Sequence, residues 1–505
     1  MKNLSELLGD YFYNNKKPVV NTTTNHIKPQ LGKSLEYLKD KFNGSADFTV
    51  RNLSVNNVSS ALLTMEGMCD KEILAVSVIN PLLEKQYPSI DKMELFMFVE
   101  KSVLSSSEVM RLETYEQVMQ MIMSGFAVLL IDGCSLALCI GAQGFSFRSV
   151  SEPDSEATER GSREGFVEPL RINMTLLRRR IKNPNLKFET ITVGGVTKTD
   201  ICLCYLTDAV SDTILEKLRE KINKINLNTV LASGYMVSYL EEKNDHSIFS
   251  GVGITERPDT TAGKINEGRI AILIDGTPSA LIIPYLFVEN FQTMGDYSYK
   301  PYYATLIRWL KYTCFFVAAL LPGIYTAIAL FNPELFPEQI LNKVAVSIGS
   351  TPFGLITEIL LVLFMYEIMR EAGLRLPKTL GHAVSIVGAL VIGDTAVNAG
   401  LIGAPTLMIV ALTAIASYVI PNLYPQLSVL RVLFIFAGGF FGMWGIILLF
   451  CMVIVNICGK SILGVPYTIP LAPFKLFGMR DVVIRAGWKT LTKKRNLIRD
   501  RKTEI

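Results

Sequence analysis

The distribution of apolar residues divides the chain into two unequal parts. Residues 1–300 carry charged side chains throughout, whereas residues 313–458 contain long apolar runs with few charges. The whole chain of 505 residues has a mean hydropathy of +0.32, and a clearly positive value is unusual for a soluble protein of this length. An apolar run of about 20 residues can cross the hydrocarbon core of a bilayer as a helix. The pattern therefore predicts a soluble region followed by a bundle of transmembrane helices.

The soluble part has the pattern of an α/β fold in two subdomains, 46–150 and 151–300, preceded by an extension, 1–45. The extension is polar and shows little pattern, so we expect it to be mobile. Period-two alternation and short apolar runs indicate strands, and a spacing of three to four residues indicates helices. The predicted strands are 48–55, 186–193 and 200–206, and the predicted helices are 91–105, 114–124, 170–181 and 211–222. The expected fold is an α/β two-subdomain soluble region followed by an all-α transmembrane helix bundle.

Each subdomain contains the same short motif, Ile-Asp-Gly between two apolar runs. The first copy is Asp132-Gly133 within 126–141, and the second is Asp275-Gly276 within 269–284. Asp-Gly between apolar runs is a strong hairpin signal, because such turns need positive φ. The repeated motif suggests two related subdomains, although one shared hairpin is slight support for a duplication.

A charged segment joins the subdomains and leads into the helix predicted at 170–181. Its acidic residues are close enough to suggest paired catalytic carboxylates, but the arginines among them favour a lattice of ion pairs. The acidic residues are Glu152, Glu156, Glu159, Glu164 and Glu168, and the arginines are Arg160, Arg163 and Arg171.

Motifs that would indicate an enzyme are missing from the sequence. It has no phosphate-binding glycine loop in strand–helix context, no nucleophile elbow and no zinc signature. The eight cysteines include no C-x-x-C pair and the three histidines are scattered, so neither a disulfide framework nor a metal site is expected. A net charge of +4 is too small to indicate nucleic acid as a partner. We expect no enzymatic activity and no cofactor.

Two stretches flank the apolar region 313–458 and bear on its orientation. Residues 301–312 combine aromatic side chains with Arg308 and Lys311, which is typical of a helix at the membrane interface. Residues 459–505 form a basic tail, and basic segments beside a span are retained in the cytoplasm. The N-terminus has no apolar core of the signal-peptide type, so the soluble region is also expected in the cytoplasm.

The apolar region holds roughly five candidate spans by the length rule. They are Thr313–Phe331, Phe353–Met369, Ala383–Ile402, Ala404–Ile420 and Val429–Cys458. An odd number of crossings would place the two ends on opposite sides, yet the basic residues at both ends favour the cytoplasm. We therefore expect that one segment does not cross and that the number of spans is even.

The segment 381–400 is apolar but rich in glycine and alanine, with one stripe of small or polar residues. Close helix packing would explain the stripe, because small residues let backbones approach. A pore would explain it equally well, because the polar groups would then face water. A membrane carboxylate needs water or a partner, so Asp394 favours the pore, and Glu358 is a second acidic candidate. The pore-lining candidates are Ser385, Gly388, Val391, Ile392, Asp394, Thr395, Asn398 and Glu358.

Several motifs together resemble the A subunit of bacterial spore germinant receptors of the GerA type. The resemblance covers about residues 45 to 490 and is carried by the segments 152–168, 173–186, 255–259, 267–278, 370–377, 385–393 and 412–421. It implies a multi-pass protein of the spore inner membrane whose soluble N-terminal domain is cytoplasmic, on the spore-core side. Members act with a transporter-like B subunit and a lipoprotein C subunit. A sibling branch works in the same membrane during ion release, and the resemblance does not separate the two branches.

The resemblance also implies a homo-oligomer, expected to be a pentamer, that conducts monovalent cations when germinant is present. The alternative is a non-conducting membrane scaffold that recruits other germination proteins. A secondary transporter is a weaker third hypothesis, because no inverted repeat of spans is detected. Assembly or gating is assigned to charged residues of the soluble region, namely Glu152, Arg160, Glu164, Arg171, Arg178 and Arg179.

Overall fold

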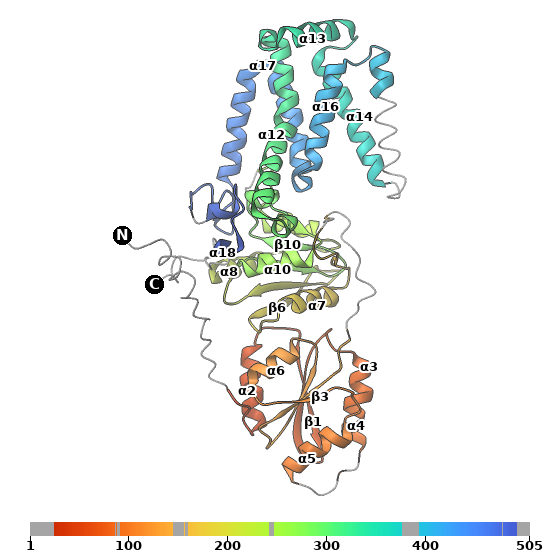
Figure 1. Ribbon diagram of the computed structural model, residues 1–505, viewed down its shortest axis with the longest axis vertical. Coiled ribbons are helices and arrows are strands. Elements are labelled where there is room, and N and C mark those ends of the chain that lie inside the picture. Colours follow the sequence, from red (N-terminus) through yellow and green to blue (C-terminus); the bar gives the residue numbers. More distant parts are fainter. Residues whose placement is uncertain are drawn as a thin grey trace, which may run out of the picture.

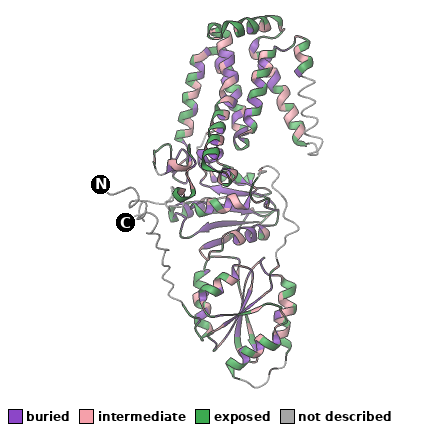
Figure 2. Cartoon of the chain, in the orientation of Figure 1, coloured by how far each residue is buried: buried purple, intermediate pink, exposed green. Residues whose placement is uncertain are grey.

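The protein consists of two β-sheet subdomains and a helical bundle that follow one another along its longest axis (Figure 1). The computed structural model describes residues 25–85, 87, 91–144, 156, 160–241, 247–375, 393–476 and 478–491. The central strands of both sheets are buried between helices, whereas the bundle exposes much of its outer surface (Figure 2). The α/β soluble region and the helical membrane region predicted from the sequence are confirmed.

The first subdomain is an antiparallel sheet of five strands in the order β1-β2-β4-β5-β3. Leu38, Val118 and Ile122 cover one face, and Val78, Leu95 and Phe96 cover the other. The strands are β1 (Phe48–Val55), β2 (Val58–Met65), β3 (Val109–Leu112), β4 (Ala127–Ile131) and β5 (Ala137–Ile140). The helices are α2 (Leu31–Lys41), α3 (Lys71–Leu74), η1 (Ala75–Ile79), α4 (Asn80–Glu84), α5 (Lys92–Phe98), η2 (Val99–Val103) and α6 (Tyr115–Ile122).

The second subdomain repeats this strand order as β6-β7-β9-β10-β8. Its strands are β6 (Leu186–Val193), β7 (Thr199–Leu206), β8 (Gly253–Thr255), β9 (Ile270–Ile274) and β10 (Ala280–Ile283). Its helices are α7 (Leu170–Arg180), α8 (Asp212–Asn223), α9 (Gly234–Leu240), α10 (Pro258–Asn266), η3 (Phe287–Phe291) and α11 (Gly295–Ser298). Helices α7 and α10 pack on one face of the sheet, and α8 and α9 pack on the other.

The two Ile-Asp-Gly motifs perform the same structural task in both subdomains. Each carboxylate accepts a hydrogen bond from the first backbone N–H of the helix that precedes the first strand: Asp132 from Leu31 at 3.1 Å, and Asp275 from Leu170 at 2.9 Å. The following glycine, with φ of +91° at Gly133 and +80° at Gly276, donates its N–H to a carbonyl just before that helix. A carboxylate at a helix N-terminus satisfies a donor that the helix leaves free. The predicted relation between the subdomains is thus confirmed by strand order and by an equivalent cap.

Both ends of the described chain contribute to sheet packing. Helix α2 lies within the predicted extension 1–45, but its Leu38 is fully buried against the first sheet. Within 459–505, a short hairpin of β11 (Ser461–Ile462) and β12 (Val465–Pro466) is followed by η6 (Gly478–Asp481) and α18 (Trp488–Leu491). The buried side chains of Ile462, Ile469 and Val482 join the core that α8 and α9 form on the second sheet. The start of this basic segment is therefore an integral part of the second subdomain.

The bundle begins with α12, a single helix that joins the predicted interfacial helix to the first predicted span. Its helices are α12 (Pro301–Phe331), η4 (Pro333–Leu335), α13 (Glu338–Ser350), α14 (Leu355–Arg375), α16 (Ala404–Tyr418), η5 (Pro421–Leu423) and α17 (Tyr424–Gly459). Helix α13 lies across the end of the bundle farthest from the sheets (Figure 1) and meets α14 at 83°. By length and composition, the described helices provide two candidate spans, or three if this bent pair counts as one.

Helix α17 reverses direction at Gly442, where φ is +59° and ψ is −148°. The first arm runs alongside α12 toward its far end, because Phe434 lies against Gly323 and Gly442 lies against Phe331. The second arm returns to the sheets, where Asn456 accepts a hydrogen bond from Ser247 at 2.8 Å. Such a φ is strained for any residue with a Cβ, so a glycine suits the reversal.

This reversal bears on the number of segments that cross. The last candidate, Val429–Cys458, contains both arms of a helical hairpin, and the expectation that one candidate segment does not cross stays a prediction. The bundle therefore starts from the sheets at α12 and returns to them at Gly459, so that both flanking regions lie on one side. Of the third candidate, Ala383–Ile402, residues 383–392 lie outside the described part of the chain.

Cysteine labelling tests the hairpin. In a background without the natural cysteines, we expect single cysteines at 422 and 458 to react with an impermeant maleimide from the same side of the membrane. Cysteines introduced by Phe441→Cys and, as a control on α13, Lys343→Cys should react from the other side. Labelling of positions 422 and 458 from opposite sides would mean that α17 crosses as one straight helix.

Candidate functional site

The first site is the joint between the two sheets, centred on the buried guanidinium of Arg178. Arg178 extends from α7 and pairs with Asp47, just before β1, at 2.8 and 3.0 Å. It also donates to Ser45 Oγ at 2.9 Å and to the carbonyls of Asn183 and Leu186 at 3.0 Å. The two side chains are 1% and 4% exposed, and a bidentate arginine–carboxylate pair has a defined geometry. One arginine therefore ties the second subdomain to the entry of the first sheet.

Lys187 reinforces this joint from the adjoining strand, β6. Its Nζ donates at 2.8 Å to the carbonyl of Lys41 at the end of α2, and next to it the N–H of Ala46 donates to Phe188. Burial, together with the nearby charge of Arg178, lowers the pKa of Lys187 to about 8. This lysine thus becomes neutral over a pH range in which an exposed lysine stays charged.

The remaining assembly candidates from the sequence divide between two locations. Arg171 pairs with Glu66 of the first subdomain, and Glu164 pairs with Arg180 at 2.6 Å and with Arg179 at 3.6 Å. Arg160 lies 5.2 Å from the ring centre of Tyr299, and Glu152 lies outside the described residues. Within the described part of the acidic segment, Glu164 therefore pairs with two arginines of α7. A cavity of about 650 Å³ opens beside these pairs, between the two subdomains.

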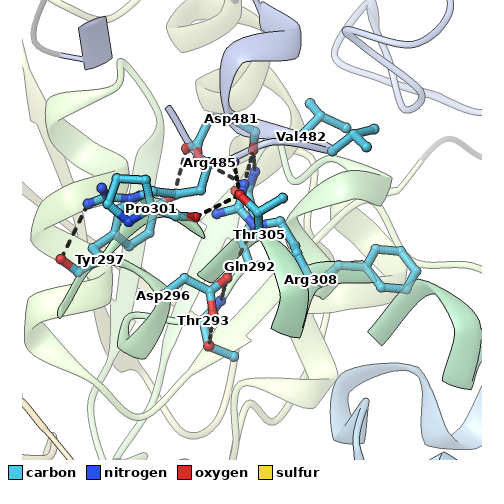
Figure 3. Close-up of polar contacts among 12 residues, drawn as sticks. Gln292, Thr293, Asp296, Tyr297, Pro301, Thr305, Arg308, Asp481, Val482 and Arg485 are labelled. Carbon is cyan, nitrogen blue, oxygen red and sulfur yellow. Dashed lines mark hydrogen bonds and ion pairs between the residues drawn. The ribbon is translucent and has the colours of Figure 1, made fainter. Parts of the chain in front are cut away.

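The second site is the joint between the second sheet and the bundle, where charged groups from three segments converge (Figure 3). Arg308, on α12, is fully buried and pairs with Asp296 at 3.2 Å and with Asp481 at 2.9 Å. Lys311, one turn further along α12, pairs with Asp296 at 3.1 Å and donates to Thr293 at 2.9 Å. The sequence places these two basic residues in an interfacial helix, which stays a prediction, and in the structure protein carboxylates neutralise both of them.

The segment that follows α17 provides the third part of this joint. Asp481 accepts a hydrogen bond from the hydroxyl of Tyr297 at 2.7 Å, and its carbonyl accepts from Gln292 at 2.6 Å. Burial raises the pKa of the Asp481 carboxyl above its usual range despite the nearby charge of Arg308. The backbone N–H of Arg485 donates to Thr305 at 3.1 Å (Figure 3). The start and the end of the bundle are thus joined to each other and to the sheet.

A buried glutamate, Glu289, links the same joint to the hairpin of the second sheet. It pairs with Lys264 of α10 at 2.7 Å and with Arg269 at the start of β9, and it accepts from the N–H of Leu286 at 2.8 Å. Burial favours the protonated acid, but the two cations outweigh it and hold the pKa of Glu289 below its usual range. The carboxylate is therefore ionised and fixed in place.

The third site is the far end of the bundle, which holds the acidic pore candidate Glu358. Its carboxylate is 1% exposed and accepts from the N–H of Gly403 at 2.8 Å, while the Thr351 hydroxyl lies at 3.4 Å. Gly403 is the N-cap of α16, so Glu358 stabilises a helix N-terminus. In a single chain this carboxylate faces protein.

Three of the other pore candidates lie in the described helical residues 393–398. Asp394, Thr395 and Asn398 are exposed there, and Gly393 packs against Leu407 of α16. Ser385, Gly388, Val391 and Ile392 lie outside the described residues. The exposed polar groups are therefore available to solvent, lipid or another subunit.

Sequence reasoning missed the acidic partners of the buried cations, namely Asp47, Asp296 and Asp481. Each is a single aspartate outside the local period of its arginine: Asp47 lies 131 residues from Arg178, and Asp296 and Asp481 lie 12 and 173 residues from Arg308. A weak signal existed for Asp481, which is an acidic residue within a basic segment.

The fold and the joints define a membrane protein with a duplicated α/β domain, built so that the soluble and helical parts share buried ion pairs. The chain belongs to the Bacillus/Clostridium GerA spore germination protein family, which matches residues 36–497. It is thus a spore germination protein of the type that forms the A subunit of germinant receptors, as the sequence motifs indicated.

Known relatives cover most of the chain. Spore germination protein KA of Bacillus subtilis is 37% identical over 467 residues, which span 92% of this chain and 85% of that protein. The B. subtilis membrane protein YfkQ is 38% identical over 471 residues, spanning 93% and 91% of the two chains. The crystal structure of the N-terminal domain of the A subunit of the Bacillus megaterium receptor GerK3 is 28% identical. It covers 52% of this chain and 98% of its own, with a TM-score of 0.41.

Removing one carboxylate tests the joint to the bundle. Asp296→Asn leaves Arg308 and Lys311 buried with less opposing charge, and breaking a buried pair in this way costs about 3–5 kcal/mol. We expect a clearly lower thermal midpoint for the full-length protein in detergent. The exposed neighbour change Lys300→Met serves as the control and should leave the midpoint unaltered. Equal midpoints for both variants would mean that the network contributes little to stability.

Lys187 predicts a pH dependence of stability. Its folded pKa is about 8 and its unfolded value is 10.5, so between these values the unfolded chain binds more protons. Stability should therefore rise with pH over this window, by up to about 1.4 kcal/mol per pH unit. Chemical unfolding curves across the window should show this slope in the wild type and in Lys182→Met, an exposed control. Lys187→Met should reduce it, and an unchanged slope would exclude Lys187 as its source.

Proposed function

We propose that the protein assembles into a germinant-gated channel for monovalent cations in the inner membrane of spores. In this proposal it is a homo-oligomer, a pentamer in which every copy contributes to the pore, and it acts with a transporter-like B subunit and a lipoprotein C subunit. The soluble domain faces the spore core. The relatives named for spore germination support the setting, and the exposed polar side chains of residues 394–398 support conduction.

The supporting observation is the contrast between this segment and its neighbours. Asp394, Thr395 and Asn398 are exposed, whereas many exposed residues of the neighbouring helices α14 and α16, such as Phe364 and Met408, are apolar. Polar groups with this exposure are costly next to lipid, whereas several copies around an axis would turn them toward water. A ring of carboxylates would attract cations.

The two joints suggest how a signal could reach such a pore. Arg178 couples the sheets, and the Arg308 network couples the second sheet to the first and last helices of the bundle. A change at the soluble domain would therefore move α12 and α17 together. Gating by this route needs two arrangements of the bundle that differ in free energy by a few kcal/mol.

The alternative function is a non-conducting scaffold that recruits other germination proteins. Its support is the large soluble domain, whose charged segments around α7 could bind partners. A scaffold needs no polar stripe in the membrane. A substitution of Asp394 should therefore alter ion conduction if the protein is a channel and should have no such effect if it is a scaffold.

Reconstitution separates the two functions. Full-length protein in liposomes should release trapped potassium, and Asp394→Asn should reduce the cation preference by about 1 kcal/mol or more, or at least fivefold. Lys343→Met, an exposed change on α13, serves as the matched control. In spores, bulky changes at Gly388 or Val391 should alter ion release at unchanged receptor abundance. Silence in liposomes with and without the B and C subunits, together with normal release from those spores, would favour the scaffold.

A further inference from the structure

A buried arginine inside the bundle, Arg431, is held by a backbone group that a proline leaves free. Pro322 lies within α12 and has no N–H, so the carbonyl of Ala318, four residues earlier, loses its usual helical donor. The Nε of Arg431, on the first arm of α17, donates to this carbonyl at 3.1 Å. In a bilayer a free carbonyl needs such a partner. The proline and the arginine are thus complementary features of two neighbouring helices.

This single hydrogen bond leaves the outer edge of the guanidinium unused. Arg431 is 1% exposed, and neither Nη1 nor Nη2 has a hydrogen-bond partner among the residues the structure describes. A guanidinium remains protonated in proteins. A buried cation without a directly paired counter-charge is destabilising by several kcal/mol, so an anionic partner at the guanidinium would stabilise the folded protein.

The nearest acidic residue, Glu367 on α14, is already engaged. Its Oε1 accepts from the hydroxyls of Tyr424 at 2.8 Å and Ser428 at 3.0 Å, and Arg370 lies 3.9 Å from its other oxygen. Arg370 in turn stacks on the Tyr424 ring at 3.5 Å. Glu367 lies within electrostatic reach of Arg431 but makes no direct ion pair with it in the described structure.

We propose that the Nη edge of Arg431 binds a small anion, a halide or a small carboxylate, inside the bundle. The two Nη groups form a fork that matches a carboxylate and also suits a halide. Because the side chain is 1% exposed, only an ion of a few atoms is compatible with the site. Arg431 on α17 donates to Ala318 of α12 and lies within electrostatic reach of Glu367 on α14, so an anion bound there would stabilise the contact of these three helices.

Thermal unfolding of the full-length protein in detergent tests the site with chloride and formate, against gluconate at matched ionic strength. Gluconate is too large for an enclosed site. The wild type should show a saturable rise in midpoint, about 1 °C once the anion reaches roughly four times its dissociation constant and larger at higher concentration. Arg431→Met should lose this response, whereas the exposed control Lys343→Met should keep it.

Arg431→Lys distinguishes the two anions. It also provides a second test if Arg431→Met fails to fold. A lysine keeps the charge but lacks the fork, so its response to chloride should persist while the advantage of formate disappears. Identical midpoints of the wild type in chloride, formate and gluconate would overturn the proposal and indicate that water alone fills the site. An anion response retained by Arg431→Met would overturn it equally.

Discussion

The ion pairs of Arg308 are the constraint on which the arrangement of the whole protein depends. This one side chain is reached by a carboxylate before α12 and by another after α17, so the chain must leave and re-enter the soluble domain at the same place. Water cannot stabilise a fully buried guanidinium, and the two aspartates therefore have to be present together. The packing of Ile462, Ile469 and Val482 against the core of the second sheet accords with this requirement.

The same principle appears at each level of the fold, with different partners. Between the sheets, Arg178 combines a bidentate carboxylate with two backbone carbonyls. Within each subdomain, the aspartate of the Ile-Asp-Gly motif accepts a hydrogen bond from the N-terminus of the helix that precedes the first strand, α2 or α7. At the far end, Glu358 does the same for α16. Polar groups at these points specify which elements meet, whereas the apolar cores provide most of the stabilisation.

Local pattern was a sound guide to the soluble region. The strands predicted at 48–55 and 186–193 match β1 and β6, because alternating burial on one sheet face leaves a period of two in the sequence. The reversal at Gly442 was not predictable in this way, since both arms of α17 are apolar and glycines in a membrane helix, such as Gly438, Gly439, Gly442 and Gly445, usually have a packing role. The burial of Arg308 was missed for a related reason. Its carboxylate partners lie 12 and 173 residues away, and no local period connects them.

The contribution of residues 460–482 to the second core has a consequence for biosynthesis. The ribosome synthesises the strands of the second sheet long before Ile462 and Val482. The sheet face that these residues cover therefore stays partly exposed while the helical region is inserted. An uncovered apolar face is a site for chaperones or for mispairing with a neighbouring nascent chain. The core of the second sheet can therefore be completed only after α17 has formed and returned to the soluble domain. Folding of the soluble domain thus depends on prior assembly of the helical region.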